Sequence, residues 1–158
     1  MAWTILRAPL VLGPGTEGAA ALRRNSSGST ATLVGGGRHR QQPLDVGDLA
    51  RASLRAAEPE RARDRVLEIA GPEGIAEREL VARAARAQGR TLRVRGMPLW
   101  AMRALLRLRS WVSGPGFSVD ALEVITTDTR VDPAAAAEAL GLELTPLEPM
   151  LRRSLELS

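Results

Sequence analysis

The first apolar segment of the chain places the strongest constraint on its fold. Residues 3–6 (WTIL) form a short apolar run with β-branched members, and Pro9 follows soon after. Because successive side chains of a strand point to opposite faces, a run that is apolar on both faces fits a buried strand of a parallel sheet. The segment 13–15 (GPG) then predicts a turn. We therefore expect an interior strand, and such a strand needs sheet neighbours that no preceding residues supply.

The rest of the sequence alternates between strand-like and helix-like segments. Further strands are expected at 31–34, 65–70 and 91–94. Segments with helical spacing of apolar residues are expected at 17–24, 48–57, 76–88, 98–112, 119–125, 134–140 and 146–157. This alternation predicts an α/β fold with a partly parallel sheet.

Several residues are typical of helix ends. Pro133 at a first helical position and Gly141 just after the last turn follow the usual asymmetry of helix termini. Asp45 and Asp48 lie three residues apart at the start of another helix. A general-base role is one interpretation of this pair, but helix N-termini attract acidic side chains for their own stabilisation, so capping is expected.

Composition excludes several kinds of chemistry. The chain has no Cys and a single histidine, His39, so a disulfide framework, a metal site and a Ser-His-Asp triad are not expected. His39 lies in a loop rich in Gly and Arg, where we expect it to be exposed. The sequence has no apolar run long enough to span a membrane and no signal peptide at residue 1, which predicts a cytoplasmic protein.

Every basic side chain other than the histidine is an arginine, and the arginines are unevenly spread. Residues 78–109 hold nine Arg and one Glu. A solvated Arg-rich face is the favoured interpretation, and an anionic surface or partner is the alternative. Within this region, helix 98–112 has Trp near both ends, which suits the core of a lobe or, alternatively, peripheral contact with a membrane. No nucleic-acid partner is expected.

Five segments, taken in order, resemble the extended and atypical short-chain dehydrogenases. The similarity extends over the whole chain and includes the NAD-dependent epimerase/dehydratase and NmrA-like groups and the NAD(P)H-binding accessory subunit of respiratory complex I. The segments are 3–7 (WTILR) with 12–15 (LGPG), 42–51 (QPLDVGDLAR), 67–73 (LEIAGPE), 78–81 (RELV) and 144–148 (LTPLE).

This resemblance implies the C-terminal part of a Rossmann-type protein. Residues 1–70 would be the last strands and helices of the NAD(P)-binding unit, and residues 71–158 a small helical substrate lobe, together one partial domain. The N-terminal Gly-rich βαβ half would be lacking, and the Gly-rich segment 35–37 is expected to be a loop rather than a substitute. NAD(P)(H) is implied for the complete protein and not for the isolated chain. The partner is then the missing half, a separate subunit or a second copy.

The resemblance also nominates cofactor-binding residues. In the family, the loop after the first strand lies against the nicotinamide, which assigns this role to Arg7, Ala8, Pro9 and Leu10. The family usually has Pro at the position of Ala8. The alternative interpretation is a loop with a purely structural role.

Arg38, Arg40 and Gln42 are the candidate substrate-binding residues. Nucleotide-sugar members carry Arg-Asp-aromatic at positions 41–43, where this chain has Gln-Gln-Pro, so a UDP-sugar is disfavoured. The two arginines offer donors to an anionic substrate, or are exposed loop charges.

The family's catalytic Tyr and Lys have no counterpart, because the chain contains neither residue type. No catalytic residue is assigned for that reason. The expected function is the C-terminal portion of an oxidoreductase or epimerase-like protein that is inactive alone, and the alternative is a non-catalytic accessory module.

Overall fold

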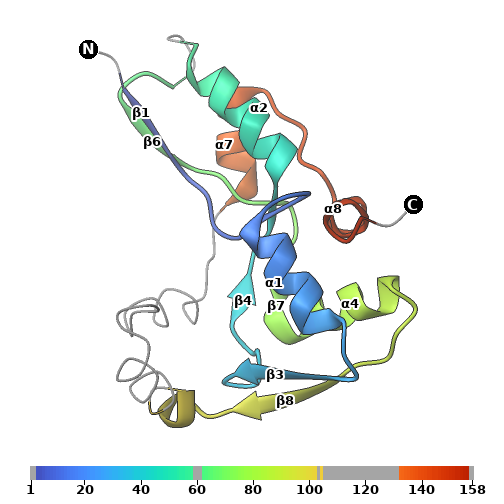
Figure 1. Ribbon diagram of the computed structural model, residues 1–158. Coiled ribbons are helices and arrows are strands. Elements are labelled where there is room, and N and C mark those ends of the chain that lie inside the picture. The colour runs from blue at the N-terminus through green and yellow to red at the C-terminus, as the bar shows by residue number, and fades with distance from the viewer. Residues whose placement is uncertain (1–2, 59–61, 103, 105–131, 157–158) are drawn as a thin grey trace.

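The α/β prediction is confirmed by the computed structural model, which describes residues 3–58, 62–102, 104 and 132–156 (Figure 1). Short strands alternate with helices through the described ranges. The elements in chain order are β1 (Thr4–Arg7), β2 (Val11–Leu12), α1 (Glu17–Ser26), β3 (Thr30–Val34), β4 (Arg40–Gln41), β5 (Leu44–Asp45), α2 (Val46–Ala56), β6 (Arg65–Glu68), β7 (Ile75–Ala76), α4 (Glu77–Ala87), β8 (Arg93–Met97), α7 (Pro133–Leu140) and α8 (Leu147–Ser154).

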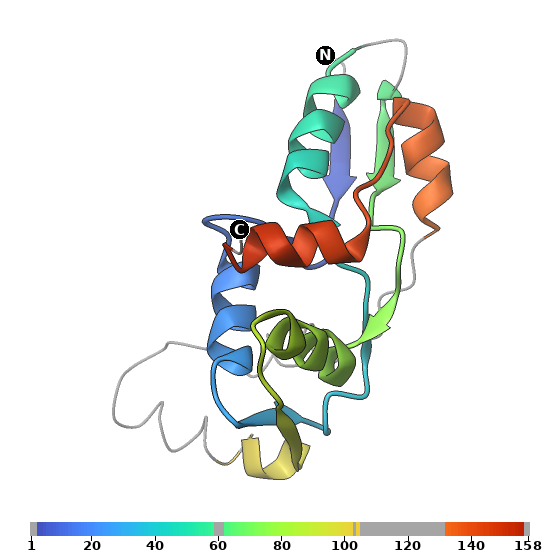
Figure 2. The ribbon, with the colours of Figure 1, turned by 90° about the vertical axis from the view of Figure 1, so that its right-hand side faces the viewer.

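The strands pair across long stretches of sequence. Three pairs are parallel: β1 with β6, β2 with β5, and β3 with β8. The fourth pair, β4 with β7, is antiparallel. The β1–β6 pair lies at one end of the molecule, flanked by α2 and α7, and the β3–β8 pair lies at the other end (Figure 2). Helices α1, α4 and α8 lie between the two ends.

The first strand is parallel to its neighbour, as expected, but the expectation that it is buried on both faces is wrong. Strand β1 is parallel to β6, with Thr4 opposite Arg65. However, within the described residues β6 is its only strand neighbour, and Trp3 and Ile5 are each 49% exposed. The opposite face is covered, since Leu6 packs against the cluster formed with α2 and α7. The sheet thus has one covered face and one apolar face in solvent.

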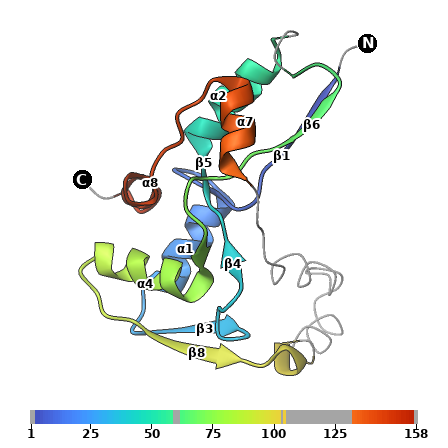
Figure 3. The same ribbon diagram turned by 180° about the vertical axis from the view of Figure 1, so that it is seen from behind.

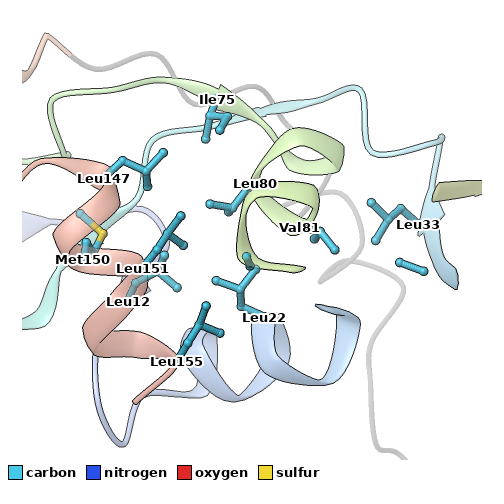
Figure 4. Close-up of a cluster of buried hydrophobic side chains, with 12 residues drawn as sticks. Leu12, Leu22, Leu33, Ile75, Leu80, Val81, Leu147, Met150, Leu151 and Leu155 are labelled. Atoms are coloured by element: carbon cyan, nitrogen blue, oxygen red, sulfur yellow. The ribbon is translucent and has the colours of Figure 1, made fainter. Parts of the chain in front are cut away.

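Two apolar clusters form the core. The larger cluster joins α1, α4 and α8, with Leu22, Leu80 and Leu151 facing one another (Figure 4). The smaller cluster lies between the β1–β6 pair and the helices α2 and α7. Figure 3 shows from behind that α8, a helix of the larger cluster, lies on the side of that cluster nearer α2. Each cluster combines residues from before and after position 70, and the predicted boundary there stays a prediction.

The helix ends follow the capping residues seen in the sequence. Asp132 caps α7, with Pro133 in its first turn, and Gly141 ends it in a left-handed conformation. The segment 35–37 is a turn, as predicted, with positive φ at all three glycines. Of the expected helix 98–112, residues 99–102 and 104 are helical and the remainder lies outside the described residues. The expected helix 119–125 lies wholly outside them.

One close approach fixes the position of the strand segment before α2. The Cα of Gly71 lies so near Pro43 that an added Cβ would be 1.8 Å from the Pro43 carbonyl oxygen. Only glycine fits there without movement of the backbone. No helix among the described residues is long and apolar enough to cross a membrane.

Candidate functional site

The loop of residues 7–10 lies beyond the carboxyl end of β1, the edge of a parallel sheet where α/β proteins bind ligands. Its two ends are fixed by the backbone: the Ile69 N–H donates to the Arg7 carbonyl at 2.9 Å, and the Leu44 N–H donates to the Leu10 carbonyl at 2.9 Å. The Arg7 guanidinium lies 3.6 Å from the Glu68 carboxylate, and both side chains are largely exposed. Ala8, between the fixed ends, faces solvent.

The three candidate substrate-binding residues do not form one group. The Arg40 guanidinium donates to the carbonyl oxygen of Gly74. The amide of Gln42 is buried and donates to the carbonyl oxygen of Gly71 at 2.8 Å. Both side chains therefore hold the turn that follows β6. Arg38 is exposed and lines a separate pocket, so the assignment of all three to one substrate stays a prediction.

That pocket has a volume of about 420 Å³ and lies at the carboxyl ends of β3 and β8. It combines two arginines, backbone of Gly residues and an apolar wall. The lining residues are Gly35, Gly36, Arg38, Arg78, Val94, Gly96, Met97 and Pro98. The sequence did not indicate Arg78 as a pocket residue, since it comes near Arg38 only because its N–H donates to the Gly37 carbonyl at 2.9 Å, next to the pairing of β4 with β7.

The expectation that His39 is exposed is wrong. Its side chain is 8% exposed, and its Nε2 lies 3.4 Å from Oε2 of Glu77, which is 17% exposed. Burial raises the pKa of Glu77 and the neighbouring His39 opposes this shift. The Glu77 N–H also donates to the His39 carbonyl at 3.1 Å. The pair joins the loop after β3 to the first turn of α4, which explains why a polar loop segment is buried.

The two acidic residues at the start of α2 have different roles. Asp45 is the N-cap, as expected: it accepts from the Gly47 N–H at 2.8 Å and also pairs with Arg153 at 2.9 Å. Asp48 is 1% exposed and holds the segment before α8, because it accepts from the N–H of Thr145 at 2.7 Å and from its hydroxyl at 2.9 Å. Both carboxylates are engaged in structural contacts, which argues against the general-base interpretation.

Comparison with known proteins gives matches among solved structures only. No family model matches the sequence. No curated protein matches it either. RMD from Pseudomonas aeruginosa, solved with NADPH, is 18% identical, with a TM-score of 0.66 over 97% of this chain and 46% of its own. The UDP-glucuronic acid 4-epimerase of Bacillus cereus, solved with UDP-glucuronic acid and NAD, is 19% identical, with a TM-score of 0.68 over 97% of this chain and 44% of its own.

The UDP-glucose 4-epimerase of Thermotoga maritima, solved with UDP-glucose, gives a similar result. It is 20% identical, with a TM-score of 0.64 over 99% of this chain and 45% of its own. The chain thus spans about half the length of these solved proteins. At these identities the likeness shows the fold: the chain has an α/β architecture like that of part of these Rossmann-type proteins.

Proposed function

We propose that this chain is the C-terminal portion of an NAD(P)-dependent oxidoreductase or epimerase-like protein. In this proposal it contributes the loop of residues 7–10 on the nicotinamide side and a small substrate lobe. Support comes from the structural likeness to proteins solved with NAD or NADPH and from the five sequence segments. The same five segments support our further proposal that the chain is related to NmrA-like proteins and to the NAD(P)H-binding accessory subunit of complex I.

The observation that carries the proposal is the uncovered β1–β6 sheet. Parallel sheets are normally buried on both faces, yet Trp3, Ile5 and Val66 are between 44% and 49% exposed. A second α/β unit that adds strands and covers this face would complete the sheet, and the solved proteins are about twice as long as this chain.

The loop of residues 7–10 suits the nicotinamide end of such a cofactor. The carbonyls of Arg7 and Leu10 are already engaged. The backbone of Ala8 and the carbonyl of Pro9 are the groups we assign to the nicotinamide carboxamide, which needs both donors and acceptors. When bound, the cofactor would supply hydride transfer. The pyrophosphate and the adenosine are assigned to the second unit.

The sequence of the second unit distinguishes an enzyme from an accessory module. This chain contains no Tyr and no Lys, so the acid–base pair of the resembled family has to come from the partner. A Tyr-x-x-x-Lys motif in the partner would support the oxidoreductase or epimerase-like function. Its absence would support a non-catalytic role, in which the cofactor is structural.

Titration of NADH and NADPH into the purified chain tests whether the second unit is needed. Cofactor fluorescence and the melting temperature are measured for the native chain and for Ala8→Trp, which fills the loop. We expect no saturable change with either protein. Saturable binding by the native chain with a raised melting temperature would contradict the need for a second unit. Its loss in Ala8→Trp would place that binding at the loop.

A further inference from the structure

The pocket at the carboxyl ends of β3 and β8 is built from segments 60 residues apart. The β3–β8 pair is parallel, with Val34 opposite Met97, so the turns that follow both strands meet at one edge. Gly36 has a φ of +73°, and a Cβ added at Gly96 would lie 3.3 Å from the Cα of Gly36. Gly96 therefore lets the two turns, which both line the pocket, approach each other closely.

The electrostatics of this pocket favour an anion. Arg38 and Arg78 are the charged residues of its lining, and no carboxylate lines it. Within the part of the chain that the structure describes, neither arginine has an ion-pair partner. The carboxylates adjacent to Arg78 in sequence are engaged elsewhere, because Glu77 pairs with His39 and Glu79 pairs with Arg83 at 3.0 Å.

The N–H groups of the turn are not available as further donors to an anion. The N–H groups of Gly35, Gly36 and Gly37 donate to the carbonyls of Met97, Leu33 and Val34 respectively. Recognition at this pocket therefore depends on the two guanidinium groups, which are donors only and which bind carboxylate and phosphate oxygens well.

The remaining wall of the pocket is apolar. It consists of Val94, Met97 and Pro98, and the exposed Leu99 and Trp100 follow directly in sequence. A volume of about 420 Å³ lies within the range of small-molecule sites. A ligand that satisfies both parts of the lining has an anionic head and an apolar body.

We propose that this pocket binds a small amphipathic anion, an organic phosphate or carboxylate, with its charged head between Arg38 and Arg78 and its apolar body on Met97 and Pro98. The lining lies entirely within this chain, so the proposal goes beyond the cofactor-dependent function and does not require a second unit. It can succeed or fail independently of the NAD(P)H titration.

The test uses the full chain, with hexyl phosphate and hexanoate as probes and inorganic phosphate for comparison. Binding is followed by the amide NMR signals of Gly35, Gly36 and Gly96. We expect saturable shifts at these glycines with one or both organic probes, and weaker binding of inorganic phosphate. Preference for hexyl phosphate or for hexanoate identifies the head group. Shifts elsewhere, or none at these glycines, would overturn the proposal.

Substitution of the arginines provides the second readout. Arg38→Gln and Arg78→Gln should each reduce the affinity for the preferred probe about tenfold, the scale of a hydrogen bond to a charged group. Arg86→Gln is the matched control, since Arg86 is an exposed arginine in the last turn of α4 and does not line the pocket. Affinity that is unchanged in both pocket variants, or that falls equally in the control, would show that the pocket is not the site.

Discussion

Replacement of Asp48 by Asn tests how the segment before α8 is held. The carboxylate is 1% exposed and accepts hydrogen bonds from the N–H and hydroxyl of Thr145 and from the guanidinium of Arg51. Asn has nearly the same shape, but one of its two oxygens becomes an NH2 group that faces a donor. The loss of one or two charge-assisted bonds in a buried site predicts a fall of about 3 kcal/mol in the free energy of unfolding.

Asp132→Asn is the matched control for this substitution. Asp132 is exposed and caps α7 by accepting from the Ala134 N–H at 3.0 Å. Asn and Asp are equally good N-caps, so this change should cost less than about 0.5 kcal/mol. Urea denaturation measures both variants, with the midpoint and the slope reported separately.

A double-mutant cycle with Thr145→Val isolates the contact itself. If Asp48 acts through Thr145, the two substitutions together should cost clearly less than the sum of their separate effects. Equal losses in Asp48→Asn and Asp132→Asn, or additive losses in the cycle, would refute the reasoning from burial and hydrogen bonding.

Three further predictions concern other parts of the molecule. Because burial raises the pKa of Glu77 above its ordinary 4.5, the unfolding free energy should fall as the pH rises from about 4.5 through that raised pKa. Urea titrations at several pH values measure this fall, and Glu77→Gln should not show it. The exposed face of β1 should promote self-association at high concentration, and sedimentation should show that Ile5→Glu weakens it; equal association of both proteins would exclude this face. Gly71→Ala should lower stability by about 3 kcal/mol or more, since its Cβ would meet the Pro43 carbonyl. Gly28→Ala is the control and should be nearly neutral in thermal denaturation, because its Cβ would have no neighbouring atom closer than 3.6 Å.

The bounds of a helix could be predicted from the sequence where its capping residues are clear. The residues Asp132, Pro133 and Gly141 predict α7 within one residue of its observed bounds, because capping depends on neighbours in sequence. The start of α2 differs by two residues from the expected position 48, because its cap is the first of the two acidic residues, Asp45.

Features that depend on distant segments could not be predicted in this way. The burial of His39 requires Glu77, which only the pairing of β4 with β7 brings near. The pocket requires the pairing of β3 with β8, and Arg78 reaches it through the hydrogen bond from its N–H to the Gly37 carbonyl. An apolar run also cannot show whether both faces of its strand are covered, and for this reason the exposure of Ile5 was missed.

The contribution of α7 to one cluster and of α8 to the other has a consequence for the order in which the protein can fold. The larger cluster needs Leu147, Met150 and Leu151, and the smaller cluster needs Ala136 and Leu140 from α7. During synthesis neither cluster can therefore close before the segment after residue 132 has left the ribosome. Contacts of such high sequence separation form slowly, because a long loop must be closed first. The apolar residues of both clusters that precede this segment therefore stay uncovered until it is available.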